Sequence, residues 1–273
     1  MVASESCALT SVSAEFVRDI EPGEILTITK DGLKSNMELA TLATAKRAHC
    51  VFEYIYFART DSIIDGQSVY SSRVRAGSIL AEKYPVDADL VIGVPESGLA
   101  AAVGYSQGSN IPYGMAFYKN SYVGRTFIKP KQNERTAGVQ AKLNVIRDVV
   151  KGKRVVMVDD SIVRGTTIRN IVKMLKDAGA LEVHVRISSP PFKHPCYYGT
   201  DVPSSENLVA VNNTIDEIKE SINADSLGFL DIEDLGQLCP GLDYCDACFT
   251  GKYAGGIPSD PSKTNSCSSK IVL

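Results

Sequence analysis

Two neighbouring carboxylates near the middle of the chain have the setting of a ligand site. Asp159 and Asp160 directly follow the apolar run 155–158, which predicts a strand buried on both faces of a sheet. Open α/β sheets bind ligands at the carboxyl ends of their strands. Ionised carboxylates accept hydrogen bonds from sugar hydroxyls and bind hard cations such as Mg²⁺. The pair therefore predicts a site for a hydroxylated ligand at a strand end.

The loop after the carboxylates adds donors for a phosphate group. It consists of Ser161, Ile162, Val163, Arg164, Gly165, Thr166 and Thr167. Gly165 lets the backbone come close to a ligand, and the successive N–H groups and the hydroxyls suit phosphate oxygens. No Gly-Lys-Ser/Thr follows, so this is not a Walker A loop. The whole run predicts a site for a phosphorylated sugar; an acidic strand end that only caps a helix is the alternative.

The segments that must position this loop predict a β-α-β unit. Apolar residues from Ile168 to Leu175 recur at i, i+3, i+4 and i+7, which indicates a helix, and Gly179 is a natural end for it. Residues 182–187 then alternate as a strand does. Strand, helix and strand over this length form a β-α-β unit. The loop therefore leads into a helix N-terminus, which is a ready anion site.

A second loop has the same setting between a strand and a helix. Residues 89–95 predict a buried strand, and an alanine-rich helix is expected from Leu99. The loop between them is Pro95, Glu96, Ser97 and Gly98. Small residues allow the backbone to approach a phosphate, and the Ser97 hydroxyl is a possible metal ligand. The alternative is an ordinary strand-to-helix turn in which Ser97 is the N-cap.

A basic segment lies between positions 119 and 142. Its basic residues are Lys119, Arg125, Lys129, Lys131, Arg135 and Lys142. Gly124, Pro130 and Gly138 interrupt it, so no long regular element is expected. A long loop in a compact domain is usually a lid or a binding loop, and its positive charge suits an anionic leaving group. A solvated charged loop is the alternative.

The chain has seven cysteines, of which Cys245 and Cys248 form a Cys-x-x-Cys pair. Cys50 and Cys196 would complete a set of four thiolates. The spacing leaves zinc, an iron–sulfur cluster and buried free cysteines open, because a tetrahedral Cys₄ set accepts either metal group. The remaining three cysteines are expected to be free thiols; they are Cys7, Cys239 and Cys267.

Length and composition limit the class of protein. A chain of 273 residues with 44% hydrophobic residues is large enough for a core in one large domain or two small ones. The net charge of −3 and the lack of a long basic run argue against nucleic acid as a partner. No stretch is long and apolar enough to span a membrane, and no secretory signal is recognisable. A reducing cytoplasm is therefore expected, where cysteines are more often metal ligands or free thiols than disulfides.

The 155–167 run resembles the signature for phosphoribosyl pyrophosphate (PRPP) in type I phosphoribosyltransferases. Four further segments resemble the family of glutamine PRPP amidotransferases, or amidophosphoribosyltransferases; they are residues 50–59, 95–98, 124–128 and 245–252. The resemblance runs from about residue 2 to Tyr253. It implies the type I phosphoribosyltransferase fold, an α/β fold whose central, mainly parallel sheet is flanked by helices.

The resemblance also implies a division of the chain. Residues 14–20 and 25–29 predict two strands joined by a turn at 21–24, and they resemble the last part of the family's glutaminase domain. Residues 1–45 are therefore expected to be a small β remnant of that domain, and 46–255 the phosphoribosyltransferase domain with its C-terminal cysteine segment. Residues 256–273 are expected to be a disordered tail.

Roles for the site residues follow from the resemblance. Ser97, Asp159 and Asp160 are expected around Mg²⁺, residues 95–98 with Lys119 on the pyrophosphate, and residues 161–167 on the 5′-phosphate. Arg125 and Lys142, in the loop that closes over PRPP, join the two aspartates as catalytic residues. The resemblance assigns a structural [4Fe–4S] cluster to Cys50, Cys196, Cys245 and Cys248. It further implies a homotetramer and feedback inhibition by purine nucleotides.

The N-terminus departs from the family pattern. The family begins with a cysteine nucleophile followed by glycine, whereas Cys7 lies behind six residues and precedes Ala8. Glutamine hydrolysis is therefore expected to be absent. Free ammonia would displace pyrophosphate from PRPP and give 5-phosphoribosylamine, the first step of purine biosynthesis.

Two other functions remain open from the sequence. The first is a phosphoribosyltransferase that acts on a nucleobase, which the PRPP signature alone does not exclude. The second is a module that binds PRPP or a nucleotide without turnover. A screen of acceptors separates the first from the amidotransferase, and binding measured beside pyrophosphate release separates the second.

Overall fold

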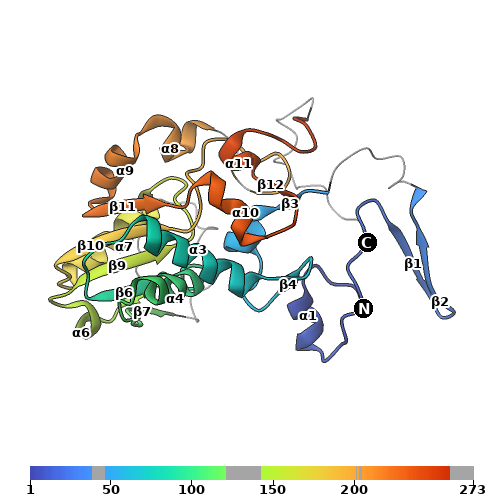
Figure 1. Cartoon of the computed structure of the whole chain (residues 1–273), viewed down its shortest axis with the longest axis horizontal. Coiled ribbons are helices and arrows are strands. Elements are labelled where there is room, and N and C mark those ends of the chain that lie inside the picture. The colour runs from blue at the N-terminus through green and yellow to red at the C-terminus, as the bar shows by residue number, and fades with distance from the viewer. Residues whose placement is uncertain (39–46, 121–142, 201, 203–204, 259–273) are drawn as a thin grey trace.

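The structure is a computed structural model that describes residues 1–38, 47–120, 143–200, 202 and 205–258. Its central sheet has four parallel strands in the order β11-β10-β9-β6 (Figure 1). The strands are β6 Leu90–Gly93, β9 Arg154–Asp159, β10 Glu182–Ile187 and β11 Ser226–Phe229. The side chains at 155–158 in β9 are completely buried. The predicted parallel sheet and its doubly buried strand are confirmed.

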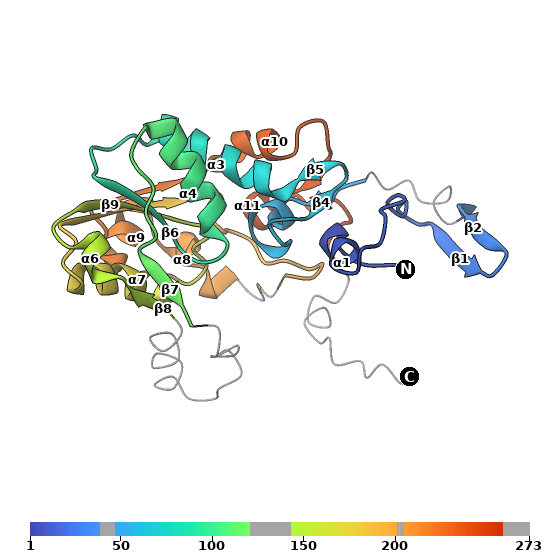
Figure 2. The same ribbon diagram turned by 90° about the horizontal axis from the view of Figure 1, so that it is seen from below.

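Helices cover both faces of this sheet. The helices α3 Val69–Lys83 and α4 Gly98–Ser109 lie on one face, and α7 Thr166–Asp177 and α9 Ile215–Ile222 lie on the other (Figure 2). Val156 and Val158 of β9 pack with α3 and α4, whereas Val155 and Met157 belong to the core under α7 and α9. Alternate side chains of one strand thus supply both cores.

Two glycines let α3 and α4 cross at close range. A Cβ atom at Gly104 would lie 1.8 Å from the carbonyl oxygen of Val74, and one at Gly77 would lie 1.8 Å from that of Ala101. No side chain fits at either position unless the helices separate. This contact fixes α4, and with it the loop that precedes α4, against the sheet.

The predicted helix after the carboxylate loop is confirmed as α7. Ile168, Ile171, Val172 and Leu175 are all buried. Gly179 has a φ of +100°, in the region that favours glycine, just beyond the helix end. The stripe of apolar residues therefore holds α7 on the sheet and directs its N-terminus to the carboxyl edge.

Shorter elements complete the described part of the chain. They are β3 His49–Cys50, the π-helix η1 Glu53–Phe57, β4 Ile63–Ile64, β5 Gln67–Ser68, β7 Phe117–Lys119, β8 Leu143–Val145, α6 Arg147–Val150, the 3₁₀ helix η3 Ser205–Asn207, α8 Val209–Asn212, the 3₁₀ helix η4 Ile232–Asp234, α10 Leu235–Leu238, β12 Tyr244–Cys245 and α11 Ala247–Thr250. No helix of the described residues has the length and apolar character that crossing a bilayer requires.

The N-terminal strands differ from the prediction. The hairpin consists of β1 Ile25–Thr29 and β2 Gly32–Asn36, and residues 14–20 form no strand. A helix, α1 Ser6–Ser11, precedes them. Thr29 pairs with Gly32 across a two-residue connection. The strand β1 therefore pairs through a tight turn with the segment that directly follows it in the chain. The strand at 14–20 was a wrong prediction; the domain boundaries at 45 and 255 stay predictions.

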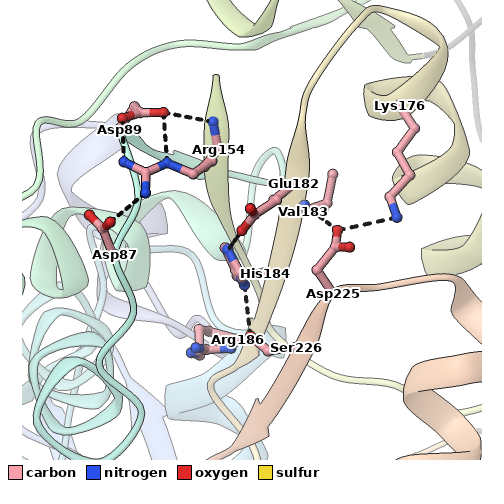
Figure 3. Close-up of polar contacts among 10 residues, drawn as sticks. All are labelled: Asp87, Asp89, Arg154, Lys176, Glu182, Val183, His184, Arg186, Asp225 and Ser226. Atoms are coloured by element: carbon pink, nitrogen blue, oxygen red, sulfur yellow. Dashed lines mark hydrogen bonds and ion pairs between the residues drawn. The ribbon is translucent and has the colours of Figure 1, made fainter. Parts of the chain in front are cut away.

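A buried polar stripe runs along β10 (Figure 3). The His184 ring lies 2.9 Å from the hydroxyl oxygen of Ser226 and, through its other nitrogen, 2.9 Å from the carboxylate of Glu182. Arg186 donates to the Ser226 hydroxyl and to the carbonyl oxygen of Tyr84. His184 is 6% exposed, and burial lowers the pKa of its imidazole.

The stripe predicts a loss of stability in acid. The unfolded-state pKa of His184 is about 6.5, and the folded-state pKa is lower, so the unfolded chain takes up the proton first. The stability contributed by the neutral ring is present above about pH 6.5 and is lost as the pH falls through the folded-state pKa. Urea unfolding should show a smaller drop between about pH 7 and pH 5 for His184→Gln than for the wild type. Equal drops would contradict this.

Candidate functional site

The pairing of β6 with β9 brings the two predicted ligand loops together. Gly93 at the end of β6 is the partner of Val158, so both strands end at the same edge of the sheet. The Ser97 hydroxyl, at the start of α4, donates to Oδ1 of Asp160 at 2.5 Å. The Ser161 hydroxyl donates to Oδ2 of the same carboxylate. One carboxylate therefore receives a hydroxyl from each loop.

This contact decides between the two interpretations of Ser97. Ser97 occupies the N-cap position of α4, but its side chain makes no capping hydrogen bond. Its hydroxyl reaches across to Asp160 instead. The loop at 95–98 is therefore more than a strand-to-helix turn closed by a capping serine, and it belongs to the same site as the carboxylate pair.

Gly98 is required by packing within the protein, whereas the small residues of this loop were expected to make room for a phosphate. A Cβ atom at Gly98 would lie 2.5 Å from the carbonyl oxygen of Val158 and 3.1 Å from the Cα atom of Asp159. The first turn of α4 lies directly on the backbone of β9, so only glycine fits. The close approach that Gly98 permits is therefore between α4 and β9, and it brings Ser97 within hydrogen-bonding distance of Asp160.

Both carboxylates are largely enclosed by protein. Asp159 is 8% exposed and Asp160 is 7% exposed. Oδ1 of Asp159 accepts a hydrogen bond from the backbone N–H of Asp160 at 2.9 Å. Burial, and then the neighbouring charge of Asp160, raise the pKa of Asp159 well above the ordinary value. A cation or a hydroxylated ligand would offset the cost of two adjacent buried charges.

The loop 161–167 divides into anchored and exposed residues. The Ile162 side chain is 2% exposed and packs in the core under α7, and the Val163 carbonyl oxygen accepts the Val209 N–H at 2.9 Å. Gly165 has a φ of +77° and precedes the first turn of α7. Arg164, Thr166 and Thr167 are exposed. The apolar residues thus hold the loop in place, and its exposed polar groups face outward at the helix N-terminus.

Lys119 is the part of the basic segment that the structure describes next to the site. Its ammonium group lies 3.2 Å from the Glu96 carboxylate, so the end of β7 meets the loop at 95–98. Arg125 and Lys142 lie in the range 121–142, outside the described residues.

The four cysteines named by the sequence analysis come together from three parts of the chain. Cys50 in β3 is the register partner of Cys245 in β12. The carbonyl oxygen of Cys248 accepts N–H groups of Lys193 and His194, both at 3.0 Å, which ties the Cys196 segment to this turn. All four cysteines line one cavity of about 1030 Å³. This cavity lies beside the N-terminal segment and does not include the carboxylate pair.

Burial makes two of these thiols weak acids. The pKa of Cys50 is raised to about 11, chiefly by burial, and burial with the neighbouring cysteines raises that of Cys248 further. Burial also acts on Cys196, but N–H groups such as that of Tyr198, 3.4 Å from its sulfur, outweigh it and lower its pKa. Within the described residues, no three His, Cys, Asp or Glu side chains are grouped closely enough to hold one metal ion.

An aromatic trio that the sequence analysis did not single out supports the cysteine segments. Phe192 packs against Phe52 and Phe249, with ring centroids 5.2 and 5.0 Å apart. Phe52 and Phe249 stand two and one residues after a cysteine, and Phe192 stands four before one. The closeness of these phenylalanines to cysteines in the sequence is the signal from which the trio could have been predicted. The packing of these rings in the core holds the three cysteine-bearing segments together, independently of any group bound to the sulfurs.

Comparison with known proteins decides the family. The model of the phosphoribosyl transferase domain matches residues 60–196, which is half of the chain. The chain belongs to the phosphoribosyltransferase family. The matched region contains both ligand loops and three of the four strands of the sheet, β6, β9 and β10. The fold expected from the resemblance is therefore confirmed.

Similar proteins within this family include amidophosphoribosyltransferases. The chain is 52% identical to that of Synechocystis over 261 residues, which are 94% of this chain and 52% of the relative. A solved structure of the allosteric regulatory enzyme of purine biosynthesis matches with a TM-score of 0.85 and 51% identity, over 94% of this chain and 56% of that one. The Bacillus subtilis enzyme, complexed with ADP and GMP, matches with a TM-score of 0.82 and 51% identity, over 92% and 56%.

These comparisons confirm the resemblance to amidophosphoribosyltransferases. The chain spans about half the length of the curated relatives it matches.

The buried carboxylate pair predicts that Asp159→Asn stabilises the unliganded protein. The folded-state pKa of Asp159 is raised above its unfolded-state value of about 3.9. Ionisation of Asp159 therefore destabilises the fold, and this effect grows as the pH rises from about 3.9 to the folded-state pKa. Asn keeps the Oδ1 acceptor without the charge. Its Tm should exceed that of the wild type at about pH 8, and the gain should shrink toward about pH 4.

Asp216→Asn is the matched control, because this carboxylate is 86% exposed on α9. Its Tm should stay close to the wild-type value at every pH, as is usual for surface substitutions. A lower Tm for Asp159→Asn at pH 8 would show that the ionised carboxylate stabilises the unliganded fold.

Proposed function

We propose that the protein is a PRPP-dependent amidophosphoribosyltransferase: an amino nucleophile attacks C1 of PRPP, pyrophosphate leaves, and 5-phosphoribosylamine forms, the first step of purine biosynthesis. The observation that carries the proposal is the hydrogen bond from Ser97 to Asp160, which joins the two phosphate-binding loops at one sheet edge. The similarity to amidophosphoribosyltransferases over 94% of the chain supports the choice of reaction. A phosphoribosyltransferase for nucleobases has no comparable support.

The proposed roles follow from the chemistry of each group. Asp159 and Asp160 accept hydrogen bonds from the ribose hydroxyls, and residues 161–167 hold the 5′-phosphate with N–H groups and the hydroxyls of Thr166 and Thr167. Residues 95–98 hold the pyrophosphate. Lys119, together with Arg125 and Lys142 from outside the described residues, neutralises the charge that develops on it. Positioning and charge stabilisation supply most of the acceleration expected for an oxocarbenium-like transition state.

The residues at this edge fit a bound magnesium ion. The Ser97 hydroxyl oxygen and the Asp160 carboxylate oxygen are 2.5 Å apart, and Asp159 adjoins them. Oxygen donors of this kind are those that Mg²⁺ takes, usually with substrate phosphates as further ligands. When bound, Mg²⁺ would neutralise pyrophosphate charge and offset the repulsion between the two aspartates.

Ammonia is proposed as the nucleophile for the chain as given. Cys7 is the cysteine nearest the N-terminus, and it is 4% exposed within α1. Its sulfur lies 3.8 Å from the Glu5 carboxylate. Cys7 therefore lacks the exposure that a nucleophile for glutamine needs.

The proposal predicts that ammonium, but not glutamine, supports turnover. Purified protein with Mg²⁺ and PRPP should release pyrophosphate when ammonium is added. Glutamine should give no release above the background without an acceptor, and adenine, hypoxanthine or orotate should give none either. Equal turnover with glutamine would contradict the ammonia assignment, and turnover with a nucleobase alone would contradict the amidotransferase assignment.

Asp160→Asn tests the site itself. The variant keeps the side-chain shape but not the charge, so turnover should fall by at least about a hundredfold, the usual effect of removing a group that stabilises the transition state. Circular dichroism should match the wild type. Binding of PRPP by the wild type without any pyrophosphate release would favour a binding module over an enzyme.

We also propose that Cys50, Cys196, Cys245 and Cys248 hold a structural [4Fe–4S] cluster. All four line one cavity, and the segments that carry them are joined by backbone hydrogen bonds and by the aromatic trio. Four cysteine thiolates are the usual ligand set of a [4Fe–4S] cluster.

Cys248→Ser should lose the cluster, whereas Cys239→Ser should keep it. Cys239 is the matched control, because it is a buried cysteine, 1% exposed, that lies outside the cavity lining. Anaerobically purified wild type and Cys239→Ser should contain about four irons per chain and show the visible absorption of an iron–sulfur cluster. Stoichiometric zinc in the wild type, with no iron, would contradict the cluster.

Regulation and assembly are proposed from the relatives and the family resemblance. The Bacillus subtilis relative was solved with ADP and GMP, which supports binding of purine nucleotides as feedback inhibitors here. A homotetramer stays a prediction from the family resemblance, and so does its location in the cytoplasm.

A further inference from the structure

The two serines that follow β10 have buried hydroxyl groups without a hydrogen-bond partner. Ser188 is 2% exposed and Ser189 is 0% exposed, and the hydroxyl oxygen of each lacks a hydrogen-bond partner. The other side-chain atom of the described residues with this property is Oδ2 of Asp65, which still faces the His49 ring in an ion pair. A buried hydroxyl without a partner destabilises the fold, so each instance needs an explanation.

The position of Ser188 relates it to the carboxylate pair. Ile187 is the register partner of Asp159, and the Ser188 N–H donates to the Asp159 carbonyl oxygen at 2.9 Å. This bond lies just beyond the last register pair of β9 and β10, so Ser188 lies at the end of β9, where Asp160 follows. Neighbouring strands lie about 4.8 Å apart. Ser188 therefore stands one strand away from the carboxylate that receives both loops.

Side-chain alternation puts the two residues on the same face of the sheet. Val156 and Val158 face α3 and α4, and Asp160 continues that series, as its bond to Ser97 of α4 shows. In β10 the buried apolar residues Val183, Val185 and Ile187 belong to the opposite core. Ser188 therefore faces the side of Asp160.

In the structure, serines other than Ser188 donate hydrogen bonds to the Asp160 carboxylate. One carboxylate oxygen receives the Ser97 hydroxyl and the other receives the Ser161 hydroxyl. Under the proposed function, on which this inference rests, both of those serines lie in loops that hold phosphate groups of the substrate. Their hydroxyls then turn to the ligand, and the carboxylate loses its two donors.

We propose that Ser188 is a positioning residue for Asp160, whose hydroxyl donates to the Asp160 carboxylate when a bound phosphoribosyl ligand engages Ser97 and Ser161. The third hydroxyl holds the carboxylate oxygens in the direction of the ribose while the first two are occupied. This role gives a partner to a buried hydroxyl that has none in the structure.

The test compares ligand affinity with the stability of the free protein. Isothermal titration of Ser188→Ala with PRPP and Mg²⁺ should show about a tenfold higher Kd than the wild type, which corresponds to about 1.4 kcal/mol. The Tm without ligand should be unchanged or higher, because the hydroxyl removed has no partner there. Ser188→Cys, which keeps the side-chain shape with a somewhat larger atom and a much weaker donor, should give the same loss of affinity.

Ser189→Ala is the matched control, because it removes an equally buried and unpartnered hydroxyl one residue further along. Its Kd should stay within about twofold of the wild type, well below a 1.4 kcal/mol effect. A wild-type Kd for Ser188→Ala, or a lower Tm of its free form with an unchanged Kd, would overturn the positioning role. If the wild type itself does not bind PRPP, the proposed function fails first, and this inference falls with it.

Discussion

The candidate site depends on one buried carboxylate that connects two strands. Asp160 accepts a hydroxyl from the loop after β6 and a hydroxyl from the loop after β9. The parallel pairing of these strands makes the contact possible, and Gly98 lets α4 lie directly on β9 so that Ser97 reaches the carboxylate. The close crossing of α3 and α4 at Gly77 and Gly104 in turn holds α4 in this place. Packing far from the site thus determines its geometry.

The free energy of this arrangement has an unfavourable part. Asp159 and Asp160 are adjacent and buried, and the pKa of Asp159 is raised accordingly. Buried charges that lack a countercharge destabilise a fold, and they are common where a ligand supplies the missing charge. The unpartnered hydroxyls of Ser188 and Ser189 lie at the same edge. Unfavourable groups therefore gather where the proposed substrate binds, which is the distribution expected of a functional site.

The cysteine site shows a different principle. Its four thiols come from segments near residues 50, 196 and 245, and two types of contact join these segments. The β3–β12 pairing aligns Cys50 with Cys245, and the Phe52, Phe192 and Phe249 rings pack together in the core. The segment that begins after Ser188 ends at Cys196, so a short stretch of chain with three prolines connects the two sites. Proline fixes φ at three positions of this stretch.

The sequence by itself determined the elements whose signals are local. The strand β9, the loop at 161–167, α7 and β10 follow from apolar periodicity and from glycine positions, and the motifs in them resemble a family that the comparisons confirm. The strand at 14–20 was wrong because partial alternation does not determine pairing, and the adjacent segment at 32–36 was the nearer partner for β1.

Only the tertiary structure decided which distant residues meet. That Ser97 bonds Asp160 instead of capping its helix, that Gly98 is required by β9, and that the Ser188 N–H bonds the Asp159 carbonyl oxygen all depend on strand order and register. Spacing along the chain carries no information about which strands become neighbours, because a crossover helix can place a strand on either side of its predecessor. Packing of the two cores on opposite faces of the sheet makes that choice.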